Sequence, residues 1–231
     1  MKEPDGSMGI GTATYWIFAK ELRTELRTRE LLHTTLVFVL LVVVLFSFTF
    51  EPTREESRRY GPGLLWLALL FAGSLMLQPS FVREQNNDTL SALRLAPIAP
   101  FSIFLGKALA SFVFLTVAEL LLLPVFAALY DVTILPVLGE ILVVLALGTA
   151  GMVTTGTVFA AIGAQARMRE LLLPLLLLPL LVPVLIASVT ATASLLVQEP
   201  AMDWTAMKFL IGFDVIYLAA SALLFEYLLE D

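Results

Sequence analysis

The sequence predicts an all-α, polytopic membrane protein with six transmembrane helices and an N-terminal amphipathic helix in the membrane interface. Of its 231 residues, 59% are hydrophobic and only 15% are charged, whereas soluble domains are about 45–50% apolar. The mean hydropathy is +0.91, and the apolar residues form blocks of about twenty, the length that a helix needs to cross a bilayer. Because lipid offers the backbone no hydrogen bonds, these blocks are expected to be helical.

The N-terminal region is polar and charged. Residues 1–11 are small, polar and acidic, and we expect a disordered tail there. In residues 12–30, apolar side chains recur at helical spacing on one face, while Lys20, Arg23 and Arg27 lie on the other. This pattern predicts an amphipathic helix in the membrane interface, with a solvated helix beside the membrane as the alternative.

The apolar blocks define the expected transmembrane helices. They lie at about residues 31–50, 64–81, 101–130, 136–164, 171–197 and 205–228, so that residues 31–231 form one six-span domain. A polar loop is expected from Glu51 to Gly63. An even number of spans places both termini on the same side of the membrane.

Lysine and arginine predict the orientation, because cytoplasmic segments carry an excess of them. An N-terminus inside the cell leaves four of the 14 basic residues outside, namely Arg54, Arg58, Arg59 and Lys208. The other ten are then cytoplasmic: Lys2, Lys20, Arg23, Arg27, Arg29, Arg83, Arg94, Lys107, Arg167 and Arg169. We therefore expect both termini in the cytoplasm.

The fifth block is rich in proline. A short basic cap with Arg167 and Arg169 opens an uncharged run that contains Pro174, Pro179 and Pro183. Each proline lacks a backbone N–H, and its ring crowds the carbonyl four residues earlier. The run therefore predicts a bent helix packed among other helices, with these prolines at the bend.

Glu119 is the main ionisable candidate inside a span. A charged side chain at this depth is costly and marks either a functional site or a contact between helices. A substrate or proton role and a structural contact both remain open for Glu119. Glu140 and Asp214 lie nearer the ends of their spans, where snorkelling or access to water would keep their carboxylates hydrated. Lys107 can snorkel to the inner interface.

The fourth block is rich in small residues, including Gly151, Thr155, Gly156 and Ala160. Pairs of small residues four apart allow helices to approach closely. We therefore expect a packing face here, within the chain or across a dimer.

Several kinds of chemistry are disfavoured. Gly106-Lys107 lacks the remainder of a phosphate-binding loop, so this chain is not expected to hydrolyse nucleotide. There is no cysteine, and His33 is the single histidine. His33 could be an axial haem ligand, but a polar residue near the lipid headgroups is the alternative. We expect no catalytic residue, no cofactor and no metal bound by this chain, and nothing indicates nucleic acid.

The polar segment between the second and third spans, residues 82–100, combines charges with leucines. Asp88 or Thr89 could cap a short helix that begins there. An amphipathic helix on the cytoplasmic side would suit docking of a soluble partner, and an ordinary solvated loop is the alternative. The docking candidates, together with the cap of the fifth span, are Arg83, Glu84, Asp88, Leu90, Leu93, Arg94, Arg167, Arg169 and Glu170.

Five stretches resemble the CcmB family of cytochrome c maturation permeases, also called haem exporter protein B. They are KELRTELRTRE, GPGLLWLALLFAG, APIAPFSIFLGKALA, AELLLLPVFAALY and GTVFAAIGAQARMRELLLPLLLLPLLVPVLIA. The resemblance covers about residues 16–197, and the last stretch is long and specific.

The resemblance implies an ABC-2-type exporter permease in the bacterial cytoplasmic (inner) membrane, with a connecting helix at the N-terminus and a coupling helix near 83–95. It implies a separate ATPase, the A subunit, which carries ATP and Mg²⁺. It also implies a haem-handling C subunit, a small D subunit, the haem chaperone E protein and a homodimer of the permease in contact with membrane lipid. Two alternatives remain: an ABC-2-type permease for a lipid, polysaccharide or drug, and a membrane scaffold that transports nothing.

Overall fold

The computed structural model describes residues 8–49, 54–86, 97–164, 169–197 and 199–230. Within these ranges the chain is helical and contains no strand. The helices are α1 (Ile10–Thr28), α2 (Glu30–Thr49), α3 (Arg54–Asn86), α5 (Pro100–Leu129), the 3₁₀ turn η1 (Leu135–Val137), α6 (Leu138–Ala164), α7 (Arg169–Leu195) and α8 (Trp204–Glu230). Among the described residues, six helical segments are long and apolar enough to cross a membrane, which confirms the predicted all-α, polytopic fold class.

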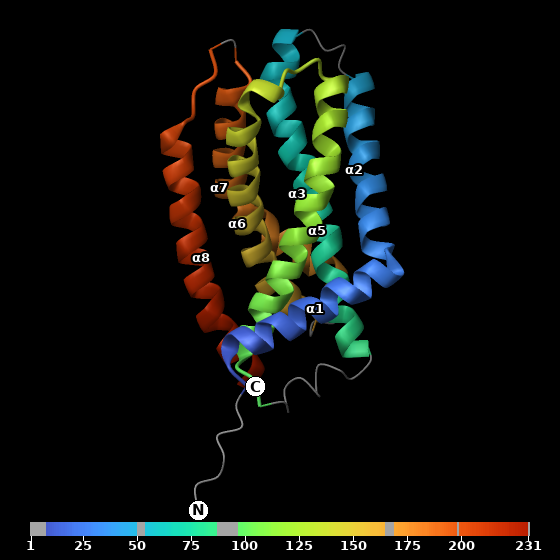
Figure 1. The fold of residues 1–231 in the computed structure, drawn as a ribbon, viewed down its shortest axis with the longest axis vertical. Helices are drawn as coiled ribbons and strands as arrows, with labels where there is room; N and C mark the ends of the chain where they lie inside the picture. The colour runs from blue at the N-terminus through green and yellow to red at the C-terminus, as the bar shows by residue number, and fades with distance from the viewer. Residues whose placement is uncertain (1–7, 50–53, 87–96, 165–168, 198, 231) are drawn as a thin grey trace, which may run out of the picture.

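The spanning helices stand side by side, and successive ones alternate in direction (Figure 1). Helix α1 lies across one end of this bundle, in front of α5. The end of α3, the start of α5 and the C-terminal end of α8 lie at that same end. We call it the α1 end of the bundle.

Helix α1 is separated from α2 by one residue in a left-handed conformation. Arg29 has φ 55°, and its N–H donates to the carbonyl of Glu25 at 2.6 Å. The Glu25 carboxylate in turn accepts a hydrogen bond from the Leu32 N–H at 3.0 Å, so it satisfies a donor in the first turn of α2. This elbow lets α1 lie across the bundle while α2 runs along it.

The prediction of a polar loop from Glu51 to Gly63 is wrong from Arg54 onward, because these residues belong to helix α3. The helix begins at Arg54, ten residues before the expected span, and continues to Asn86. Arginine and glutamate favour helices, so the charged segment extends the helix beyond its apolar part. A Cβ built on Gly61 would lie 3.1 Å from the Phe126 ring, so this glycine permits close packing of α3 against α5.

Helix α6 occupies the centre of the bundle and contacts α3, α5, α7 and α8. A Cβ on Gly148 would overlap the Trp66 ring of α3, and one on Gly156 would overlap Leu77. The small residues of α6 therefore form a packing face within the chain, as expected. The indole of Trp66 is fully buried there and donates to Thr192 Oγ1 of α7 at 2.9 Å.

Candidate functional site

The strongest link between α1 and the spanning helices is its crossing with α5. A Cβ on Gly106 would lie 2.8 Å from Ile17 Cβ and 3.0 Å from the carbonyl oxygen of Thr14. Real Cβ atoms do not approach other atoms so closely, so only glycine at this position permits the observed distance between α1 and α5. The side of α1 that faces α5 contains Ala13, Thr14 and Ile17, all of which are buried.

An ion pair lies next to this crossing. Lys107 is 2% exposed, and its Nζ donates to Glu21 Oε1 at 2.8 Å. Lys20 Nζ lies 3.1 Å from the same oxygen. Burial raises the pKa of Glu21, but the charges of Lys107 and Lys20 and their hydrogen bonds outweigh this effect, so the pKa lies below its ordinary value. The Lys107 ammonium is therefore buried and held by α1, and its snorkelling to the inner interface stays a prediction.

Two further hydrogen bonds connect the start of α1 to the start of α5. The Ser102 hydroxyl donates to the carbonyl of Ile10 at 3.3 Å. The N–H of Met8 donates to the carbonyl of Pro97, also at 3.3 Å. Residues 97–107 are thus attached to α1 over several turns. We call the contacts of residues 97–107 with α1 the α1–α5 junction.

Sequence reasoning did not find this junction. Neither Gly106 nor Glu21 belongs to a sequence motif that indicates a contact between α1 and α5. The available signal was a glycine next to a lysine inside an apolar block, facing a helix with an acidic residue between basic ones. That signal identifies no partner until the crossing of α1 and α5 is known.

The predicted docking residues are only partly within the described structure. Arg83 and Glu84 lie in the last turns of α3, and Arg169 and Glu170 are the first residues of α7. The end of α3 lies at the α1 end of the bundle (Figure 1). The remaining candidates lie outside the described residues: Asp88, Leu90, Leu93, Arg94 and Arg167.

Glu119 lies between α5 and α6. Its side chain is 2% exposed and accepts a hydrogen bond from the hydroxyl of Thr149, which is fully buried. A carboxyl group in this position links two spanning helices, and polar contacts of this kind hold membrane helices together. The geometry therefore supplies a structural contact for Glu119, one of the two roles left open by the sequence.

The position of Asp214 differs from the prediction that its carboxylate reaches the interface or water. It lies ten residues into α8, and both carboxylate oxygens are buried without a hydrogen-bond partner among the described residues. A Cβ on Gly151 would lie 2.8 Å from Asp214 Oδ1. The glycine thus makes room for the carboxyl group between α6 and α8. Glu140, in contrast, is exposed in the first turn of α6.

Helix α7 continues through the proline-rich run. Pro174, Pro179 and Pro183 all lie within its helical range, and the last two are exposed on its surface. The absence of the N–H of Pro179 and Pro183 frees the carbonyls of Leu175 and Pro179 from the regular ladder. The predicted bend at these residues stays a prediction.

His33 lies at the start of α2 and is exposed. One ring nitrogen, Nδ1, lies 2.5 Å from the carbonyl oxygen of Arg29. Within the described residues no group of three or more histidine, cysteine, aspartate or glutamate side chains could hold a metal ion. The geometry places His33 in the elbow between α1 and α2.

Comparisons with known proteins place this chain in a family. Residues 12–227 match the family model described as "CcmB protein". The chain is 35% identical to haem exporter protein B of Rhodobacter capsulatus over 160 residues, 69% of this chain and 73% of that protein. It is 33% identical to the protein of the same name from Pseudomonas aeruginosa over 163 residues, 70% and 72% of the two chains. With the protein of that name from Paracoccus denitrificans, 30% identity extends over 207 residues, 90% and 92% of the two chains. The chain therefore belongs to the CcmB family.

Proposed function

We propose that this chain is the membrane permease subunit of an ABC transporter complex in cytochrome c maturation. Its relatives carry the name haem exporter protein B, and its six apolar helices provide the membrane-spanning part that such a subunit needs. ATP hydrolysis takes place on a separate ATPase subunit. The chain itself is non-catalytic and converts closure of that ATPase into movement of helices.

The α1–α5 junction is the observation that carries this proposal. A coupling subunit needs a rigid connection between the surface that receives a force and the helices that move. Residues 83–95 receive the force, and α5 follows them directly. Gly106 and Lys107 fix α1 to α5 through Ile17 and Glu21, so a displacement of this segment moves α1 and α5 together.

Coupling also needs an element with two arrangements, because a partner shifts an equilibrium only by binding one state better than the other. Helix α7 is the element we assign to this role. It begins at Arg169, which with Arg167 and Glu170 forms the second docking surface in addition to residues 83–95, and it contains three prolines that interrupt its hydrogen-bond ladder. Docking at both surfaces would favour one arrangement of α7 relative to α6.

The partners follow from the same proposal. The ATPase (A) subunit docks at the α1 end of the bundle, and the C and D subunits and the haem chaperone E protein complete the pathway. Two copies of this chain form the permease. Both termini lie in the cytoplasm and the chain lies in the bacterial inner membrane, which agrees with the ten basic residues of the inner segments against four outside.

Co-purification of the complex in mild detergent tests this proposal. Arg94→Glu is expected to weaken recovery of the ATPase subunit while leaving membrane insertion intact, because it reverses a charge in the docking segment. The matched control is Lys208→Glu, which reverses an exposed charge in α8 and should retain the ATPase.

The two alternative functions give different results. A single copy of the chain without any ATPase would contradict the central claim. If the chain co-purifies with an ATPase but its deletion leaves cytochrome c yield unchanged, the chain is a permease for another substrate. Normal cytochrome c maturation with a catalytically inactive ATPase would indicate a scaffold.

A further inference from the structure

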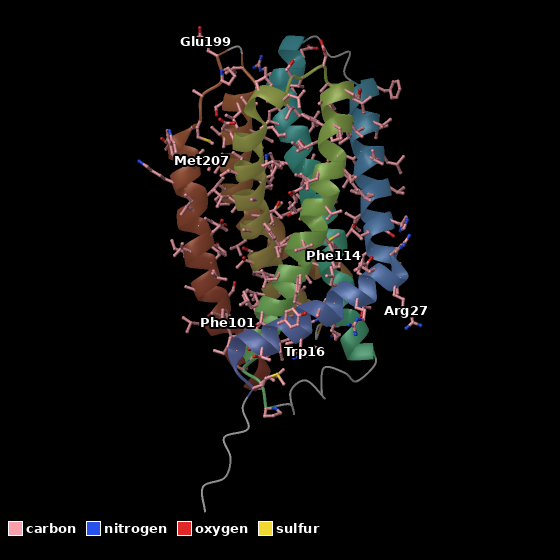
Figure 2. All side chains as sticks on the ribbon, viewed as in Figure 1. Trp16, Arg27, Phe101, Phe114, Glu199 and Met207 are labelled. Carbon is pink, nitrogen blue, oxygen red and sulfur yellow. The ribbon has the colours of Figure 1, made fainter. Side chains whose placement is uncertain are left out.

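The side of α1 that faces away from the bundle contains a basic groove. A cavity of about 250 Å³ is lined there by Trp16, Ala19, Lys20, Arg23, Thr24 and Arg27. The four largest of these side chains are spaced by four, three and four residues, so they lie along one stripe of the helix. Figure 2 shows Trp16 and Arg27 on this outer side of α1. We call this cavity the α1 groove.

The α1 groove is positively charged. Three of its six lining residues are basic, and none is acidic. Glu21, which lies between Lys20 and Arg23 in the sequence, is directed toward Lys107 of α5, although it also contacts Lys20. Arg23 and Arg27 are exposed, and their planar guanidinium groups match the oxygens of a phosphate better than an ammonium does.

Exposed apolar side chains next to the groove indicate which class of anion it binds. Tyr15, Trp16 and Leu26 are 61%, 58% and 57% exposed, and the rings of Tyr15 and Trp16 pack edge to face with centroids 5.8 Å apart. Tryptophan and tyrosine concentrate where the membrane meets water. Helix α1 also lies across the ends of the spanning helices (Figure 1), where lipid headgroups are expected when these helices cross a bilayer. Together, the cations and the exposed apolar side chains match the two parts of a lipid.

We propose that the α1 groove binds the phosphate headgroup of an anionic phospholipid. Arg23 and Arg27 contact the phosphate, Lys20 adds positive charge, and Trp16 and Leu26 contact the glycerol and the first part of the acyl chains. This site is independent of the proposed transport function. It would hold α1 at the membrane surface from its outer side while the α1–α5 junction holds it from the inner side.

Lipid binding to the full chain in mild detergent tests the site. The chain is titrated with phosphatidylglycerol or phosphatidylcholine, and bound lipids are counted by native mass spectrometry. Arg23→Gln together with Arg27→Gln should weaken phosphatidylglycerol binding about 30-fold, since each basic residue near an anionic lipid contributes about 1 kcal/mol. Phosphatidylcholine binding should not change.

Two matched variants separate the groove from general charge and from folding. Arg59→Gln with Lys208→Gln removes the same charge from exposed residues of α3 and α8 outside the groove and should leave binding unchanged. Arg23→Lys with Arg27→Lys keeps the charge and should lose less affinity than the glutamine variant does. Its melting temperature reports whether substitution in α1 alters the fold.

Three results would overturn the proposal. Equal losses of phosphatidylglycerol in the Arg23/Arg27 and Arg59/Lys208 variants would show unspecific attraction. Displacement of the lipid by inorganic phosphate at the same concentration would show a site for a soluble anion. Unchanged lipid binding in the Arg23→Gln, Arg27→Gln variant, with loss of the ATPase subunit on purification, would show a protein-docking surface instead.

Discussion

Lys107 of α5 is buried and donates to the Glu21 carboxylate of α1 at 2.8 Å. This pair joins the amphipathic helix to the bundle at the point where Gly106 allows the two helices to cross closely. Removing the partner of a buried charge is strongly destabilising because that charge stays buried. The pair therefore makes the position of α1 depend on two residues that are 86 positions apart in the chain.

Glu21→Leu is expected to release α1 from α5. The change removes the carboxylate partner of a lysine that is 2% exposed, at a cost of about 3 kcal/mol. Hydrogen exchange should increase in residues 10–28, and cytochrome c yield should fall although the chain is still inserted. Glu21→Lys combined with Lys107→Glu restores the opposite charges and should recover much of the protection. Equal exchange in the Glu21→Leu variant and the wild type would show that the pair does not hold α1.

The same pair predicts a dependence on acidity. The pKa of Glu21 is lowered in the folded chain relative to its ordinary value of 4.5. The pair therefore stabilises the docked helix fully above pH 4.5, and this stabilisation is lost as the pH falls through the lowered pKa. Exchange of α1 amides, corrected for the intrinsic effect of pH, should rise below pH 4.5 in the wild type. In Glu21→Gln the corrected rate should be high and independent of pH.

Gly106→Ala tests the steric side of the junction. The added Cβ would lie 2.8 Å from Ile17 Cβ and 3.0 Å from a backbone oxygen of α1, so α1 must shift outward. Overpacking of this kind costs about 1–3 kcal/mol. Thermal melting in detergent should show a lower transition temperature and hydrogen exchange should increase in α1.

Gly212→Ala is the matched control for Gly106→Ala. This glycine also lies in a spanning helix, but a Cβ there meets no atom within 4 Å. The control should melt like the wild type or slightly higher, because alanine favours helices more than glycine does. If both variants melt alike, the close approach of α1 and α5 is not required.

The limits of prediction from the sequence follow from the range of the interactions. The six spans and the amphipathic α1 depend on local patterns of apolar and charged residues, so composition and periodicity suffice to find them. The early start of α3 cannot be predicted in this way, because a charged segment is equally typical of a loop and of an extended helix. The contacts of Lys107, Gly106 and Asp214 cannot be predicted from local patterns, because helices distant in sequence form their surroundings. Whether a buried charge snorkels or pairs is decided by such neighbours.

Thr149→Val should destabilise the chain more than Glu119→Gln does. The valine removes the hydroxyl that donates to Glu119 and leaves a buried carboxyl group without that bond, which costs about 1–3 kcal/mol. Glutamine at position 119 keeps an oxygen that accepts the bond from Thr149. If Glu119 is a contact between helices, Glu119→Gln should retain both melting temperature and cytochrome c yield. A normally folded Glu119→Gln variant without cytochrome c maturation would instead assign a proton or substrate role to this residue.

Pro179→Ala together with Pro183→Ala tests whether α7 is the moving element. Both prolines are exposed on α7, so their replacement removes little packing. The new N–H groups can bond the carbonyls of Leu175 and Pro179, which should straighten and stiffen the helix. We expect normal insertion, normal ATPase binding and an unchanged or higher melting temperature, but ATP hydrolysis no longer coupled to cytochrome c maturation. As a control, Pro124→Ala replaces an exposed proline inside α5, a helix to which no bend is assigned, and should leave coupling intact. Normal maturation in the Pro179/Pro183 variant would limit these prolines to a role in packing, and the coupling movement would then have to be sought in α1 and α5.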